Sequence, residues 1–454
     1  MGKGNGAPVV PPPDNHQLQA VVEFELQSKC AEGWNLRVNG RTLESTNPIR
    51  TITDGIEWDK SSGKSFISLA LGDPAACGSH MRVPDAAVTS LVEVVRNCEH
   101  NGYAVSSGLP DCRRAVADHL SEKLPFQLSE QDVIMTAGCN QALQVCLDVL
   151  AFDGCNILVP RPGFPIYETY CKFLGVESRG YSLLQEQDWE IDLDQLVELA
   201  DSNTAAVIVA NPGNPCGSVY SYHHVAQIAR VAEKLRIPII ADEVYADMAF
   251  GGRKFVPMAE FSLVAPVLTV GAVSKRWLAP GWRLGWIAVC DPHHILTKAK
   301  VMEGIQKVMQ IKLGPSTLVQ GAFANLLRNT PKSFYDNSLR LLEEGAELCY
   351  QRIRTIPGLD CPSKPQGSMF MMVRINPAVL KGIKDDVEFS SALVKEESVL
   401  VLPGSAFKLA NWFRILFALP LSEMTEAWDR IEAFCNSRYK ASISYTNGTL
   451  NCTS

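Results

Sequence analysis

Short apolar runs alternate with longer helical segments between residues 132 and 289, and this alternation is the strongest constraint that the sequence places on its fold. The runs are four to six residues long, which suits strands buried on both faces, and the segments between several of them suit helices. The pattern predicts an α/β fold whose mostly parallel sheet is covered by helices on both sides. The predicted strands are 132–136, 156–159, 206–210, 238–241, 267–270 and 284–289. One predicted helix spans 225–234, with Ser221 as its capping residue.

A different pattern begins after Leu318. Long helices predicted at 331–356 and 385–396 alternate with strands at 368–375, 400–402 and 413–418, which indicates a second, smaller α+β region. A chain of 454 residues is too long for one compact core, so two packed regions are expected. The predicted divisions are a flexible arm (1–45), a segment packing with the small domain (46–79), a large α/β domain (80–320), a small domain (321–436) and a loose tail (437–454).

Composition excludes several classes of protein. The net charge of −7 argues against a nucleic-acid binder, which usually carries a basic face. No stretch reaches the roughly 18 apolar residues of a membrane span, and the first residues lack a secretory signal pattern. The 14 cysteines lie mostly in apolar runs, which is typical of reduced thiols in a cytoplasmic protein. The histidine pairs 223–224 and 293–294 are expected at the surface or at helix caps, and no metal site is predicted.

The segment 274–286 carries the most specific chemical signal. Lys275 ends a β-rich run, and Arg283 follows it by eight residues. A desolvated lysine whose amine is neutral near pH 7 can form a Schiff base, and an arginine presents forked donors to a phosphate. If the segment stood alone, a surface lysine and a structural arginine would be the more ordinary explanation.

Three further segments point to the same kind of site. Asp242 and Tyr245 follow the apolar run 238–241, and acids at the carboxyl ends of such strands lie where α/β sheets bind ligands. A turn at 211–217 follows another strand, although a Pro/Gly turn alone has a purely structural explanation. The segment 136–143 runs from strand to helix, where free backbone amides can bind a phosphate.

Taken in order, these segments and the Pro-Arg-Pro-Gly-Phe run at 160–164 resemble the class I aminotransferases of fold type I, which use pyridoxal 5'-phosphate (PLP). The likeness is greatest to the tyrosine aminotransferase branch, with its plant tyrosine and nicotianamine relatives. It extends from about Asn47 to Phe434, and five motifs in the family's order make a chance agreement negligible.

The resemblance implies a role for each matching residue around the cofactor ring. Lys275 corresponds to the lysine that binds PLP covalently and later moves the substrate's proton. Asp242 corresponds to the acid that pairs with the pyridine nitrogen, while Tyr245 and Asn214 hydrogen-bond the ring oxygen. Phe164 corresponds to the aromatic residue that stacks on the ring.

The resemblance also assigns residues to the phosphate and the substrate. Gly138, Cys139, Asn140 and Arg283 would form the phosphate cup, and Ser274 belongs to the same cofactor site. Many class I enzymes have Ser or Thr, which donates to the phosphate, where this chain has Ala272. Tyr103 would reach the phosphate of the neighbouring subunit in a homodimer. Arg414 would bind the substrate α-carboxylate, with Gly72 contacting the same group.

The predicted activity is transfer of an amino group from an aromatic L-amino acid, tyrosine or phenylalanine first, to a 2-oxo acid such as 2-oxoglutarate. Ile49 and Ile52 are expected to supply an apolar wall near the substrate. A PLP-dependent carbon–sulfur lyase shares nearly all of these residues, and a requirement for an oxo acid separates the two. A PLP-sensing regulator would need a DNA-binding module, for which the first 45 residues are too short and irregular.

Overall fold

A computed structural model of the chain describes residues 37–55, 63–74 and 81–440. Residue contacts divide the chain into two units, 1–43 and 44–454. Helix α2 (Gly40–Glu44) begins in the first unit, and the second unit contains the three sheets and all the other elements below. The Gly/Pro-rich residues 1–17 of the predicted arm and residues 441–454 of the predicted tail lie outside the described residues.

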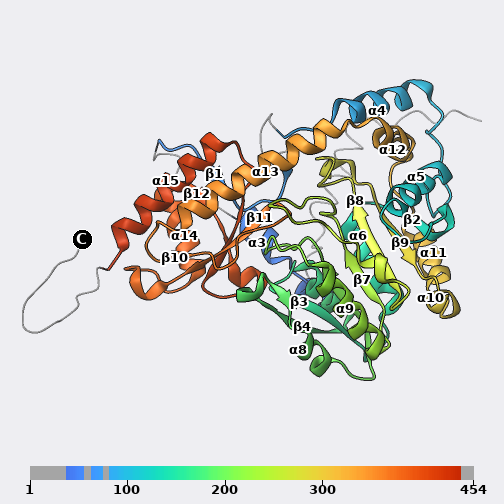
Figure 1. The fold of residues 1–454 in the computed structure, drawn as a ribbon, viewed down its shortest axis with the longest axis horizontal. Coiled ribbons are helices and arrows are strands. Elements are labelled where there is room, and N and C mark those ends of the chain that lie inside the picture. Colours follow the sequence, from blue (N-terminus) through green and yellow to red (C-terminus); the bar gives the residue numbers. More distant parts are fainter. Residues whose placement is uncertain (1–36, 56–62, 75–80, 441–454) are drawn as a thin grey trace, which may run out of the picture. The chain divides into compact units, whose positions relative to one another are not determined.

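The large sheet has eight strands in the order β2-β9-β8-β7-β6-β3-β4-β5 (Figure 1). Strands β4, β3, β6, β7 and β8 run parallel, whereas β9 is antiparallel to both β2 and β8, and β5 is antiparallel to β4. The predicted parallel sheet is therefore confirmed in its centre. The strands are β2 (Val133–Thr136), β3 (Asn156–Arg161), β4 (Glu177–Leu184), β5 (Glu190–Ile191), β6 (Thr204–Ala210), β7 (Ile239–Asp242), β8 (Val267–Ala272) and β9 (Gly285–Cys290).

Helices cover both faces of this sheet, as the unbroken apolar runs predict. In β7, Ile240 faces one core while Ile239 and Ala241 face the other, because side chains alternate along a strand. The first core includes α6 (Cys139–Leu150), α7 (Ile166–Leu174) and α11 (Val301–Lys312). The second includes α4 (Asp85–Asn97), α5 (Pro110–Ser121), α8 (Leu193–Leu199), α9 (Tyr222–Leu235) and α12 (Thr317–Asn329).

The smaller sheet is antiparallel, with the order β10-β11-β14-β13. Its strands are β10 (Leu359–Asp360), β11 (Phe370–Ile375), β13 (Leu402–Pro403) and β14 (Trp412–Leu416). Helices α13 (Lys332–Ile353), α14 (Asp386–Glu397) and α15 (Leu421–Arg438) share its core, in which Trp428 and Phe389 are fully buried. Strand β1 (Ile67–Ser68) pairs in parallel with β12 (Val399–Leu400), so this part of the predicted segment 46–79 contacts the small region.

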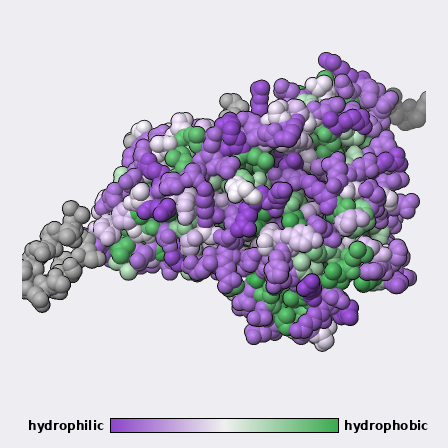
Figure 2. All heavy atoms as spheres, viewed as in Figure 1, coloured by the Kyte–Doolittle hydropathy of each residue, from purple (hydrophilic) through white to green (hydrophobic). Residues whose placement is uncertain are grey.

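The remaining elements are short. They are α3 (Pro48–Asp54), α10 (Ile295–Lys298) and the 3₁₀ turns η3 (Glu130–Asp132), η4 (Gln185–Gln187), η5 (Met258–Phe261), η6 (Pro280–Trp282), η7 (Pro377–Val379) and η8 (Gly404–Phe407). The face in Figure 2 is largely hydrophilic, with apolar side chains in scattered patches. No helix within the described ranges is long and apolar enough to cross a membrane.

Ser221 caps α9 as predicted, since its hydroxyl accepts a hydrogen bond from the His224 amide at 3.2 Å. The expectation that His224 lies at the surface or at a cap is wrong: its ring is buried, and Nε2 accepts from the Ile191 amide at 2.9 Å. The run 400–402 is also not one strand, because its residues are divided between β12 and β13, which belong to different sheets.

Candidate active site

A cavity of about 570 Å³ opens where the carboxyl ends of the parallel strands approach the smaller sheet. Ligands of open α/β sheets bind at such strand ends. Its walls come from segments that follow β6, β7 and β8, from α3 and α6, and from β11 and β14. Eleven of the predicted site residues line it: Gly72, Cys139, Asn140, Phe164, Asn214, Asp242, Tyr245, Ser274, Lys275, Arg283 and Arg414.

Asp242 lies at the end of β7, on the face that carries Ile240. The alternation of side chains therefore directs its carboxylate toward α6 and α7, and directs the next residue, Glu243, to the opposite face. The Tyr167 hydroxyl donates to Asp242 Oδ2 at 2.6 Å, and the Cys139 thiol lies 3.4 Å from Oδ1. Burial raises the pKa of Asp242, while the hydrogen bonds from Tyr167, the Val244 amide and Cys139 act in the opposite direction.

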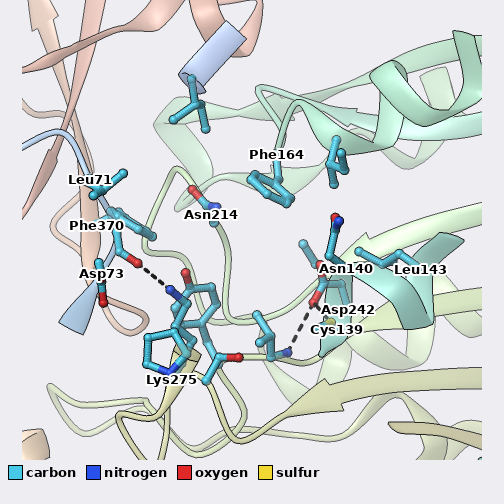
Figure 3. A pocket seen from close by; sticks show the side chains of 18 of the residues that line it. Leu71, Asp73, Cys139, Asn140, Leu143, Phe164, Asn214, Asp242, Lys275 and Phe370 are labelled. Atoms are coloured by element: carbon cyan, nitrogen blue, oxygen red, sulfur yellow. Dashed lines mark hydrogen bonds between the residues drawn. The ribbon is translucent and has the colours of Figure 1, made fainter. Parts of the chain in front are cut away.

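Lys275 stands three residues beyond β8, at the neighbouring strand end. Its Nζ, which points into the cavity (Figure 3), donates to the Gly72 carbonyl oxygen at 2.5 Å. It lies 5.9 Å from the centre of the Tyr245 ring. Tyr245 is buried, and its ring also meets Phe370 edge to face at 6.0 Å. The amine and the phenol thus face the same part of the cavity from two adjacent strand ends.

The start of α6 forms a cup suited to an anion. The helix begins at Cys139, and the preceding Gly138 has φ +85° and no capping side chain. The first amides of a helix have no acceptor within it, so those of Cys139 and Asn140 are available to a ligand. Arg283 crosses this turn and donates to the Ala137 carbonyl at 2.9 Å.

Gly138 does not line the cavity itself, but the cup depends on its lack of a side chain. A Cβ built there would come within 2.6 Å of Arg283 Nη2. Gly285 lets the start of β9 lie against the same helix start, since a Cβ at that position would lie 2.8 Å from the Cys139 nitrogen. The two glycines therefore let the arginine lie directly against the helix start.

Arg414 extends from β14 and is only 2% exposed. Its guanidinium donates to Asn214 Oδ1 at 2.9 Å and to the Ala70 carbonyl at 2.6 Å, and it lies 3.9 Å from the centre of the Phe370 ring. Among the described residues, no hydrogen-bond acceptor reaches its buried Nε. Burial lowers the pKa of Arg414 to about 9, so the site holds a buried cation that an incoming carboxylate would neutralise.

Phe164 and Asn214 lie across the cavity from Lys275 (Figure 3). Phe164 precedes α7, and its ring meets Tyr167 edge to face at 5.8 Å. Ser274 is buried beside the lysine and also lines the cavity. Three predicted contributors to one site thus come together from segments about 50 residues apart in the sequence.

Besides Gly138, two predicted residues are not among those that line the cavity. Tyr103 is 99% exposed and is not among the lining residues. Ile49 lines the cavity, but Ile52 does not, and it packs instead against the core formed by Ile49, Ala70 and Phe407. The expected apolar wall therefore includes only Ile49 of the two, because helix α3 turns Ile52 toward that core.

The sequence did not single out several lining residues: Arg50, Leu71, Asp73, Leu143, Tyr167 and Phe370. Tyr167 and Phe370 occupy ordinary apolar patterns of a helix and a strand, so their sequence gives no sign of a site. Arg50 directly follows Ile49, which was expected near the substrate, and its charge is the signal that could have singled it out. No group of three or more His, Cys, Asp or Glu side chains that could hold a metal ion occurs in the described ranges.

Comparison of the sequence with known proteins gives consistent results. Residues 64–431 match the family model "Aminotransferase class I and II". The chain is 44% identical over 382 residues to nicotianamine aminotransferase 1 of Oryza sativa subsp. japonica, covering 84% of this chain and 77% of that protein. It is 42% identical over 408 residues to tyrosine aminotransferase of Mus musculus, covering 89% and 88% respectively.

The fold leads to the same group of proteins. The chain superimposes on the crystal structure of tyrosine aminotransferase from Leishmania infantum with a TM-score of 0.86, at 32% identity, covering 90% of this chain and all of that one. An alanine aminotransferase from Pyrococcus furiosus gives a TM-score of 0.80 at 30% identity. The residues matched by the family model, 64–431, include every strand of the sheets and all the site segments described above except α3.

Proposed function

This chain belongs to the aminotransferase class I and II family and has its fold-type-I architecture, and from that premise we propose that it uses PLP to transfer the amino group of an aromatic L-amino acid to a 2-oxo acid such as 2-oxoglutarate. The observation that supports this most is the meeting of Lys275, Asp242, Tyr245, Arg283 and Arg414 around one cavity. Nothing in the stability of a purely structural protein would require these ionisable side chains to surround one cavity.

The residues present fit PLP. Arg283, the start of α6 and Ser274 would hold the phosphate, and Gly138 leaves the room that the cup needs. Asp242 would ion-pair with the ring nitrogen, and burial of that carboxylate favours a cationic partner. The side chains of Asn214 and Tyr245 would hydrogen-bond the ring oxygen, and Phe164 would cover the ring.

Bound PLP supplies a protonated pyridine ring that withdraws electrons and acidifies the Cα–H of the amino acid. The chain's own residues would then move the proton that leaves Cα. The Lys275 amine, which the Gly72 carbonyl holds at 2.5 Å, would take the proton from Cα and return it to the cofactor side. Asp242 would keep the ring nitrogen protonated throughout.

Arg414 would position the substrate. A carboxylate in front of its guanidinium would satisfy a buried cation whose contacts are a side-chain amide, a carbonyl and aromatic rings. Two-point binding of the α-carboxylate sets which bond at Cα stands perpendicular to the ring. Gly72 lies in the same wall, as the resemblance implies.

The cavity offers both an apolar and a charged surface to the substrate side chain. Ile49 and Leu71 supply apolar wall for an aromatic donor. Arg50 lines the same cavity from α3, with Asp54 at 3.7 Å and 63% of its side chain exposed. Its guanidinium is the cation that we propose to meet the distal carboxylate of an acidic acceptor, which Arg414 cannot reach while it holds the α-carboxylate.

We propose a homodimer in which Tyr103 contacts the phosphate of the neighbouring subunit. The 99% exposure of Tyr103 supports this assignment, since nothing in the described part of the chain buries its ring. Val105, Ile311 and Leu313 are further exposed apolar side chains that an interface would cover. A cytoplasmic location is proposed from the cysteines, all of which are unpaired within the described ranges.

The main alternative is a carbon–sulfur lyase of the same fold. The test measures kcat/KM for tyrosine, phenylalanine, aspartate and a cysteine conjugate, each with and without 2-oxoglutarate, with Lys275→Ala as the inactive control. We expect tyrosine and phenylalanine to be the best donors and to require the oxo acid. Turnover of the cysteine conjugate without any oxo acid, faster than tyrosine transamination, would replace this proposal with the lyase.

A further inference from the structure

Arg276 directly follows Lys275 but lies outside the cavity. It lines a separate recess together with His119, Glu243, Asp247 and Trp277. Asp247 stands two residues beyond Tyr245, and Arg276 one residue beyond Lys275. The two residues thus belong to the two segments that carry the phenol and the amine of the proposed site.

Two contacts of Arg276 join these segments, and two neighbouring side chains support them. Arg276 Nη1 donates to the backbone carbonyl of Asp247 at 3.1 Å, and Nη2 lies 3.7 Å from the Asp247 carboxylate. The other oxygen of this carboxylate accepts a hydrogen bond from Lys123. The guanidinium also lies 4.2 Å from the centre of the Tyr335 ring, whose hydroxyl accepts from Trp277 Nε1 at 2.8 Å.

Asp247 adopts a backbone conformation that this arrangement supports. Its φ is +62°, in the left-handed region that residues other than glycine seldom occupy. The neighbouring turn is closed by hydrogen bonds from Ala246 to the Glu243 carbonyl and from Met248 to the Tyr245 carbonyl, at 2.8 and 2.9 Å. In this turn the Asp247 carbonyl oxygen lies 3.1 Å from Arg276 Nη1.

We propose that Asp247 and Arg276 are positioning residues that hold the Tyr245 hydroxyl and the Lys275 amine in register, an inference that rests on the proposed function. The Arg276 side chain of one segment is hydrogen-bonded to the Asp247 backbone of the other, so a shift of either segment would move both. Lys275 and Tyr245 are 5.9 Å apart, from Nζ to ring centre, and a displacement of about 1 Å can cost a catalytic site about 100-fold in rate.

The connection can be tested on the cofactor-free protein by amide hydrogen exchange. In Asp247→Ala and in Arg276→Gln, amide exchange should become about tenfold faster in both 243–248 and 274–279. The first variant loses the carboxylate that pairs with Arg276, and the second loses the charged guanidinium. Asp247→Asn keeps a residue that tolerates the left-handed backbone and guards against a folding failure. Asp336→Asn removes an exposed helical ion pair with Lys332 and is the matched control, with no change expected in either segment.

The second measurement uses the PLP-loaded protein. The pH midpoint at which its visible absorbance changes should shift in Asp247→Asn and Arg276→Gln, and kcat should fall about tenfold or more with little change in the KM of the amino acid. Lys123→Gln should have a smaller effect, since Lys123 contacts neither site segment's backbone. Faster exchange confined to the mutated segment, or an unshifted absorbance midpoint, would overturn the inference. Failure to bind PLP would instead refute the proposed function, while the exchange data would still decide whether the two segments are joined.

Discussion

The Tyr167 hydroxyl donates a 2.6 Å hydrogen bond to Asp242, across 75 positions of the sequence. Both groups are buried, and burial alone would favour a protonated carboxyl. The bond from Tyr167, the Cys139 thiol and the Val244 amide together favour the charged form. Tyr167 therefore belongs to the group that would keep the cofactor's ring nitrogen protonated, although it does not act on the substrate itself.

Tyr167→Phe should lower kcat by roughly 10- to 100-fold, because a hydrogen bond to a charged group contributes about 1.5–3 kcal/mol. Asp242→Asn should lose several orders of magnitude, because it removes the charge itself. Steady-state kinetics of the two variants checks both expectations. Tyr170→Phe is the matched control: its hydroxyl lies on the same helix and donates to Asp148, also at 2.6 Å, away from the site. Equal effects of the two tyrosine variants would contradict the assignment.

Lys275 should be the residue that binds PLP. The purified protein should absorb in the visible-violet range, and borohydride should attach the cofactor irreversibly to one peptide. Mass spectrometry of the digest identifies that peptide, and Lys275→Ala should lose both the absorbance and the attachment. Lys123→Ala is the control, since Lys123 bonds to Asp247 and does not line the cavity. Attachment at any other lysine would show that the site is misassigned.

Tyr103 should act across a dimer interface. Tyr103→Phe and Lys275→Ala are each expected to be poorly active, but a mixed dimer has one site with both lesions and one with neither. Random exchange of equal amounts should therefore restore roughly a quarter of wild-type activity. The measurement is activity after verified subunit exchange. If activity stays at the mean of the two parents, each subunit builds its site alone.

Asp242 and Lys275 were predictable because each follows a buried strand, and the ends of parallel strands meet at one edge of a sheet. The motifs also predicted Arg283 and Arg414. Tyr167 was not predictable, because its approach to Asp242 depends on how α7 packs on the sheet. The Cys139 thiol likewise faces Asp242, whereas the resemblance gave the residue only a place in the phosphate cup.

The fold shows the same limits. Strand β4 was missed because its sequence Glu-Ser-Arg-Gly-Tyr-Ser-Leu-Leu has no regular alternation, and only Tyr181 is fully buried in it. The apolar run of β9 predicted a strand but not its antiparallel direction, because a strand buried on both faces looks the same in either orientation. The predicted domain limits stay a prediction.

Glu243 should make stability depend on pH. Burial raises its pKa from 4.5 to about 8, against the Met258 amide and the charge of Lys123, while Asp247 and Asp242 raise it further. Between pH 4.5 and about 8, Glu243 stays protonated in the folded chain but is ionised in the unfolded chain. The protonated carboxyl therefore contributes to the free energy of unfolding in full below about pH 4.5, and this contribution is lost as the pH rises to about 8. Glu243→Gln keeps the acceptor for Met258 and stays neutral. Its Tm relative to wild type should rise between about pH 5 and 8 and then level, whereas a constant difference in thermal unfolding would contradict the assignment.

Arg50 should select for acidic acceptors. Its guanidinium lines the cavity on the exposed side, and a hydrogen bond to a second carboxylate would contribute about 1.5 kcal/mol or more. In Arg50→Gln the KM for 2-oxoglutarate should therefore rise about tenfold, while the KM for phenylalanine, which has no second carboxylate, should change little. Asp54→Asn is the control, since it removes the residue that lies 3.7 Å from Arg50 on the same helix and leaves the guanidinium free to bind. Steady-state kinetics with 2-oxoglutarate and pyruvate as acceptors makes the comparison. A parallel rise in KM for both acceptors would show that Arg50 shapes the cavity without recognising the second carboxylate.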